Sequence, residues 1–219
     1  SPSPASSSSA SGRPAAPRRW RRGRALTARP VWPLANLSMN LGSDDTDLHA
    51  LARVQFGELP QADDINRDLL RAYLREKDAA GVRRSHHFDG RFENTYIDAQ
   101  QLPELLPVSR FAARAAQRVL GRADLKYGFW FNEMAPGQQT SLHSHEELDE
   151  LLSAVYYVTC PDDSGRLILH DDEAKIVIDP RPGLLVLFPP DLPHEVEENR
   201  GRGTRLSVAF NFGPPNSET

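Results

Sequence analysis

The segment SLHSH at 141–145 places two histidines one residue apart, and a third, His194, ends the segment FPPDLPH fifty-one residues after the first. Residues i and i+2 of a β-strand point to the same side, so His143 and His145 can face one interior together. Neutral imidazoles bind Fe, Zn, Cu and Ni, and a set of three leaves positions open for oxygen and substrate. The spacing predicts a catalytic metal centre held by His143, His145 and His194.

A second chemical signal lies in the segment TRLSVAFNF at 204–212, where Arg205 and Ser207 share one face. An arginine that points into a barrel among apolar neighbours is costly unless it meets an anion. The guanidinium group matches a carboxylate in a bidentate manner, and Ser207 adds a donor beside it. We therefore expect Arg205 and Ser207 to bind a carboxylate next to the metal.

The elements that must position these residues are short apolar or alternating segments, which follow one another from residue 126 and are separated by turn signals. Eight strands within about ninety residues predict a mainly β fold with flanking helices, in the form of a jelly-roll, cupin-like double-stranded β-helix over residues 124–215. The segments are KYGFWFNEM, QQTSLHSH, LSAVYYVT, GRLILH, AKIVID, GLLVLFP, HEVEEN and TRLSVAFNF.

Residues 36–123 are expected to form a helical N-terminal portion that packs on the barrel. Two amphipathic helices are predicted there, at 64–81 and 107–121, which end at Gly81 and Gly121. Asp63 or Asp64 is the predicted N-cap of the first helix. The predicted buried positions are Ile65, Leu69, Leu70, Tyr73 and Leu74 in the first helix, and Val108, Phe111, Ala112, Ala115 and Val119 in the second.

Composition narrows the functional classes. Residues 1–35 form a basic tail rich in Ser, Pro and Arg, which reads either as disordered or as an organelle-targeting segment. Residues 31–219 carry 19 basic and 30 acidic groups, a balance that argues against nucleic-acid binding. The single Cys160 suits a reducing compartment, so we expect an intracellular protein, cytoplasmic or organellar. No segment has the pattern of a membrane-spanning helix. Association into a homodimer is an open alternative.

Together these residues resemble the Fe(II)- and 2-oxoglutarate-dependent dioxygenases, in particular a bacterial and phage-type branch. The resemblance runs from about Trp130 to Asn211 and is carried by HSH before SAVYYV, by GLLVLFPPDLPH and by RLSVAFN. It implies a double-stranded β-helix, Fe(II), the cosubstrate 2-oxoglutarate, O₂, and hydroxylation of a small-molecule or peptide substrate with release of succinate and CO₂. It also implies that Arg205 and Ser207 hold the far carboxylate of 2-oxoglutarate.

Two other sets of ligands stay open at this point. The family usually has His-x-Asp/Glu, and His145-Glu146-Glu147 supplies that pattern in a shifted register. GQQTSLHSHEELDE also fits a general cupin pattern that adds Glu150 as a ligand. A cupin enzyme without 2-oxoglutarate, such as a thiol dioxygenase or an isomerase, or a non-catalytic binding cupin, would leave Arg205 and Ser207 without a role.

The remaining candidates are weaker. Asn132 and Tyr157 lie on strand faces where they could line the site for 2-oxoglutarate or substrate. His87-Phe-Asp89 is another His-x-Asp sequence, but it lies outside the strand series, and we expect a turn at Asp89-Gly90 instead of a ligand pair.

Overall fold

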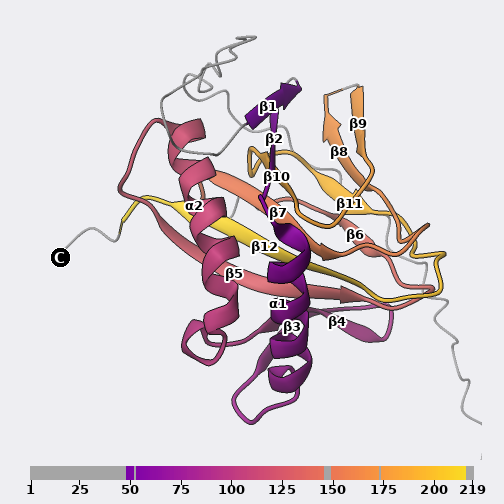
Figure 1. Cartoon of the computed structure of the whole chain (residues 1–219). Coiled ribbons are helices and arrows are strands. Elements are labelled where there is room, and N and C mark those ends of the chain that lie inside the picture. The colour runs from indigo at the N-terminus through magenta and orange to yellow at the C-terminus, as the bar shows by residue number, and fades with distance from the viewer. Residues whose placement is uncertain (1–47, 52, 146–148, 173, 216–219) are drawn as a thin grey trace, which may run out of the picture. The chain divides into compact units, whose positions relative to one another are not determined.

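The computed structural model describes residues 48–51, 53–145, 149–172 and 174–215 of the chain. The predicted tail, residues 1–35, lies outside the described residues. Two antiparallel sheets and two long helices make up the described part (Figure 1). Within it, every helix is too short or too polar to span a bilayer.

All eight segments that the sequence predicts as strands are strands. The predicted mainly β fold with flanking helices is confirmed. The strands are β5 (Lys126–Met134), β6 (Thr140–His143), β7 (Leu152–Thr159), β8 (Leu167–Asp171), β9 (Ala174–Ile178), β10 (Leu184–Phe188), β11 (His194–Val196) and β12 (Arg205–Gly213).

The N-terminal portion, predicted as helical, also contains two hairpins. Their strands are β1 (Leu48–Leu51), β2 (Val54–Glu58), β3 (Arg83–Phe88) and β4 (Arg91–Tyr96). Asp89 and Gly90 form the predicted turn, with φ of 47° and 77°, which is the backbone that Asp-Gly favours in a two-residue hairpin. The flanking strands do not stand out in the sequence because most side chains of β3 are exposed and therefore show no apolar alternation.

The two sheets enclose one apolar core. The larger sheet has the order β1-β2-β10-β7-β12-β5-β4-β3 and the smaller sheet has the order β6-β11-β8-β9. Side chains from both sheets meet in a single buried cluster, so the sheets pack face to face. This cluster includes Tyr157 of β7, Leu167 and Leu169 of β8, Ile178 of β9, and Val186 and Phe188 of β10.

Two helices cover the outer face of the larger sheet, α1 (Ala62–Glu76) and α2 (Leu106–Leu120) (Figure 1). Two short 3-10 helices, Ala99–Gln101 and Pro103–Leu105, lead into α2. α2 buries Val108, Phe111 and Ala115 as predicted, and it ends at Gly121. The φ of Gly121 is 65°, the left-handed conformation that glycine adopts after a helix.

The start of α1 corrects one prediction. The expected N-cap was Asp63 or Asp64, whereas the helix begins at Ala62. Both aspartates lie in the first turn, where a carboxylate interacts favourably with the positive end of the helix dipole. The backbone before the helix is held by the sheet, since the Leu59 N–H donates to the Gly183 carbonyl at 3.0 Å.

The buried face of α1 is also rotated from the predicted one. Leu69 and Tyr73 are buried as expected, but Leu74 is 54% exposed and the polar Asn66 is buried in its place. Asn66 is tolerated there because its Oδ1 accepts a hydrogen bond from the Tyr156 hydroxyl at 2.8 Å.

Candidate active site

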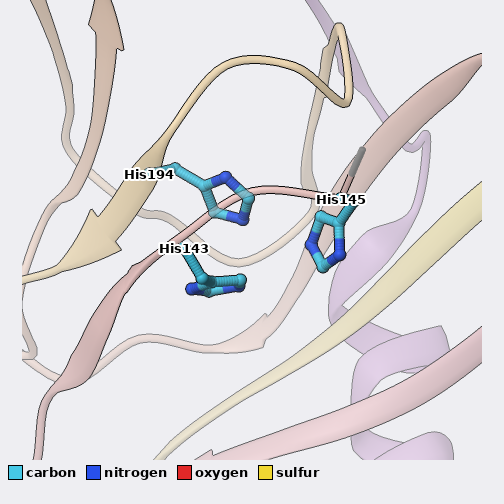
Figure 2. A group of neighbouring side chains, drawn as sticks. All are labelled: His143, His145 and His194. Carbon is cyan, nitrogen blue, oxygen red and sulfur yellow. The ribbon is translucent and has the colours of Figure 1, made fainter. Parts of the chain in front are cut away.

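The three predicted histidine ligands converge on one point (Figure 2). His143 ends β6, His145 lies two residues further on, and His194 begins β11. β6 and β11 are paired so that His143 lies opposite His194. One ring nitrogen from each histidine lies within 4.8 Å of the others, which is a spacing that a single metal ion can bridge.

Backbone carbonyls select the tautomer of two of these rings. The Nδ1 of His143 donates to the Ser141 carbonyl at 2.7 Å, and the Nδ1 of His194 donates to the Leu192 carbonyl at 2.9 Å. A carbonyl can only accept, so Nδ1 carries the proton and the lone pair is on Nε2. This outer hydrogen bond is the usual partner of a metal-binding imidazole, and it fixes the orientation of the ring.

The rings of His194 and His145 are neutral at physiological pH, which is the form that binds metals. Burial lowers the pKa of His194 to about 3, and the neighbouring His143 adds to the effect. Burial also lowers the pKa of His145 to about 4, with further contributions from His143 and His86. Metal binding at neutral pH therefore does not have to displace protons from these two side chains.

Arg205 lies fully buried on β12, with 2% of its surface exposed. Its Nη1 donates to the Gly165 carbonyl at 2.9 Å, and its guanidinium carbon lies 4.9 Å from the centre of the Tyr157 ring. The Nε of Arg205 and the hydroxyl of Tyr157 have no hydrogen-bond partner, and within the described residues Arg205 forms no ion pair. Burying a cation of this kind is costly unless an anion joins it.

The remaining predicted residues lie beside Arg205 in register. Ser207 of β12 pairs with Asn132 of β5 on one side and with Tyr157 of β7 on the other. Arg205, Ser207, Asn132 and Tyr157 line one cavity of about 120 Å³ together with the three histidines. The cavity thus combines a set of metal-binding groups with a buried, unneutralised cation.

Residues 129–213, which run from within β5 to the end of β12, match the family model of the 2OG-Fe(II) oxygenase superfamily. The barrel is therefore similar to the 2OG-Fe(II) oxygenase superfamily. The matched segment contains His143, His145, His194 and Arg205. No curated protein sequence matches the chain.

Solved structures share the fold of this chain at low sequence identity. A prolyl hydroxylase from Trichoplax adhaerens, in complex with a peptide fragment of hypoxia inducible factor, has a TM-score of 0.57 at 13% identity and covers 74% of this chain and 84% of its own. A prolyl-4-hydroxylase from Pseudomonas putida has a TM-score of 0.53 at 20% identity, with coverages of 75% and 89%. The epimerase SnoN, in complex with Fe³⁺ and alpha ketoglutarate, has a TM-score of 0.58 at 14% identity, with coverages of 74% and 80%.

Among the described residues, no carboxylate joins the group of three histidines. Glu150, the extra ligand of the cupin pattern, neither joins the three histidines nor lines the cavity. Glu147, the ligand of the shifted register, lies outside the described residues. His87 and Asp89 do not join the group either, and the ring of His87 packs edge-on against Phe92.

Sequence reasoning missed one side of the cavity. His86, Glu93 and Asn94 of the β3–β4 hairpin line it. Trp130 of β5 also lines the cavity, and its ring lies 5.8 Å from that of His145. The Asp89-Gly90 turn could have indicated the hairpin, because Asp-Gly between two short segments is a strong hairpin signal. No local pattern places that hairpin beside the histidines.

His86 has an unusual backbone that turns it toward the cavity. Its φ is 57°, in the left-handed region. In a regular strand His86 would point away from Ser85, yet its Nδ1 lies 2.7 Å from the Ser85 Oγ and accepts from the Asn94 Nδ2 at 3.0 Å. In the neutral ring, Nε2 therefore carries the proton.

This conformation predicts that glycine and alanine variants rank in opposite orders of stability at His86 and at His87. At His86, the His86→Gly variant should be more stable than His86→Ala by about 1 kcal/mol, because only glycine adopts positive φ without strain. At His87, which keeps a regular strand backbone, the alanine variant should be the more stable by about 0.5 kcal/mol. Urea unfolding of the four variants measures both differences in stability. If glycine and alanine ranked in the same order at both positions, the left-handed backbone of His86 would be contradicted.

Proposed function

We propose that the chain is a 2-oxoglutarate-dependent hydroxylase in which His143, His145 and His194 hold Fe(II) and Arg205 binds the carboxylate of 2-oxoglutarate remote from the metal. One observation carries the proposal: a buried arginine that forms no ion pair with any described residue lines the same cavity as three clustered imidazoles. The cupin alternatives explain the histidines but give this cation no counterion.

The residues present fit both groups. Imidazole nitrogen is a good ligand for Fe(II), and three neutral imidazoles place no protein charge on the ion. A dianionic cosubstrate is then the natural counterion of the ion and of Arg205 together. Iron bound at this centre would supply the oxidative chemistry, in which 2-oxoglutarate and O₂ are consumed, succinate and CO₂ are released, and a C–H bond of the substrate is hydroxylated.

The side chains of the cavity orient the metal ligands and bind the carboxylate of the cosubstrate. His143 and His194 are held by their carbonyl partners with Nε2 directed away from the backbone, which reduces the ordering that metal binding requires. Arg205 offers its free Nε, and Tyr157 its free hydroxyl, to a carboxylate, so two unpartnered buried groups become satisfied on binding. Both groups lie in a largely apolar interior, where a charge-assisted hydrogen bond is stronger than in water.

The substrate side of the cavity is assigned to the β3–β4 hairpin and to Trp130 of β5, the strand that pairs with β4. His86 presents an N–H donor, Asn94 an amide, and Trp130 a flat apolar face. These groups support a substrate with a hydrogen-bond acceptor near an apolar surface. The similar structures support both kinds of substrate, since one was solved with a peptide and another with the small molecule nogalamycin RO.

Anaerobic titration of the metal-free protein with Fe(II) and then 2-oxoglutarate tests the proposal. We expect the visible charge-transfer band of the iron–2-oxoglutarate chelate to appear and to saturate at one equivalent of each. Iron binding without the band would favour a cupin metalloenzyme that does not use 2-oxoglutarate. Absence of iron binding would leave the histidine cluster without a metal function.

A further inference from the structure

The loop Pro189–Pro193, between β10 and β11, contacts every segment that carries a proposed metal ligand. The Pro190 carbonyl accepts from the backbone N–H of His145 at 2.9 Å. The Leu192 carbonyl accepts from the Nδ1 of His194 at 2.9 Å. Since β11 pairs His194 with His143, a displacement of this loop would move all three imidazoles relative to one another.

An arginine from the N-terminal hairpin holds this loop from outside. Arg53, in the turn between β1 and β2, donates from Nη2 to both carboxylate oxygens of Asp191, at 2.8 and 3.0 Å. Its Nη1 donates to the Oδ1 of Asp171, at the end of β8, at 3.3 Å. One guanidinium group thus ties the loop to β8, which is itself a neighbour of β11.

Arg53 is not needed to attach its own hairpin to the barrel. β2 pairs with β10 over four residues, from Leu184 to Leu187, and Val54 is completely buried in the core beneath them. The hairpin is therefore anchored by backbone pairing and apolar packing. The ion pairs of Arg53 therefore restrain the Pro189–Pro193 loop and are not required to attach the hairpin.

We propose that Arg53 is a positioning residue for the metal centre, acting through Asp191 on the loop that joins His145 and His194; the inference rests on the proposed function of that centre. Isolated surface ion pairs contribute little, but a network in which one arginine joins two carboxylates is an arrangement in which they do contribute. Groups that orient metal ligands from outside typically change metal affinity by about 10- to 100-fold. Because Asp191 is half-exposed, we expect the lower end of that range.

Cobalt(II) alone, titrated without cosubstrate into the full chain, is a suitable probe because its visible spectrum reports on ligand geometry. We expect Arg53→Ala to raise the dissociation constant for Co(II) about tenfold and to alter the spectrum of the complex. Arg53→Lys should recover part of the loss. The exchanged pair Arg53→Asp with Asp191→Arg should bind Co(II) more tightly than either single variant.

Arg181→Ala is the matched control. Arg181 forms an ion pair with Glu58, at the end of β2, so this variant removes an arginine–carboxylate pair from the same hairpin without touching the loop. It should leave the affinity and the spectrum unchanged, and the melting temperatures of the metal-free Arg53→Ala and Arg181→Ala proteins should agree. Equal Co(II) binding by Arg53→Ala and the parent would overturn the positioning role, whereas failure of the parent to bind Co(II) would instead overturn the metal centre itself.

Discussion

Replacing Arg205 by methionine is expected to weaken 2-oxoglutarate binding about 100-fold while Fe(II) binding stays within about twofold of the parent. Charge-assisted hydrogen bonds to a carboxylate contribute about 1.5–3 kcal/mol, which corresponds to roughly 10- to 150-fold in affinity. Arg205 is not one of the three grouped histidines, so the metal site keeps its donor atoms. Isothermal titration with 2-oxoglutarate under anaerobic conditions, after saturation with Fe(II), measures the effect.

Methionine is preferred to alanine here because it fills most of the volume of a side chain that is completely buried. Arg166→Met provides the control, since Arg166 pairs with Glu197 and does not line the cavity. An Arg205→Met protein that keeps its melting temperature and binds 2-oxoglutarate as tightly as the parent would contradict the assignment.

The largest effect on the metal centre is expected for His194→Ala, which should lower Fe(II) affinity by more than about 100-fold. Losing one of three ligands removes a metal–nitrogen bond, and His194 is the most buried of the three, so water replaces it poorly. Competition with a chromogenic chelator measures the dissociation constant. His87→Ala is the control, because His87 lies on the outer side of the β3–β4 hairpin, against Phe92, and does not join the group.

His145→Asp provides the companion measurement. The family pattern has a carboxylate at this position, and carboxylate oxygen is also a ligand of Fe(II) in sites that combine two histidines with one acid. We therefore expect His145→Asp to retain Fe(II) binding where His145→Ala loses it. Equal loss in both variants would show that the third imidazole is required for reasons other than supplying a ligand atom.

Local patterns explain why the metal-binding and carboxylate-binding groups could be predicted. His143 and His145 follow the two-residue period of a strand, and His194 follows a proline-rich turn that begins a new strand. Arg205 stands out because the opposite face of its strand is apolar, and Ser207 lies beside it on its own face. In each case the functional residue can be recognised from a local pattern of about ten residues.

The parts that could not be predicted depend on long-range pairing or on a single dihedral angle. A two-residue period places His86 on the side opposite Ser85, and only its φ of 57° reverses that. Arg53 meets Asp191 across 138 residues, because β2 joins the sheet beside β10, and neither strand indicates its neighbour. Asn66 occupies the buried face of α1 only because Tyr156 provides a partner.

The position of β6 has a consequence for the lifetime of the protein. β6 is a four-residue strand at the edge of the smaller sheet, and its one neighbour there, β11, is three residues long. Short edge strands open at low free-energy cost, which exposes backbone amides to solvent exchange and to proteases. An ion bound by both His143 and His194 would link the two strands. A ligand present at 100 times its dissociation constant stabilises the folded form by about 2.7 kcal/mol. Iron supply would then govern how long the polypeptide survives as well as whether it reacts.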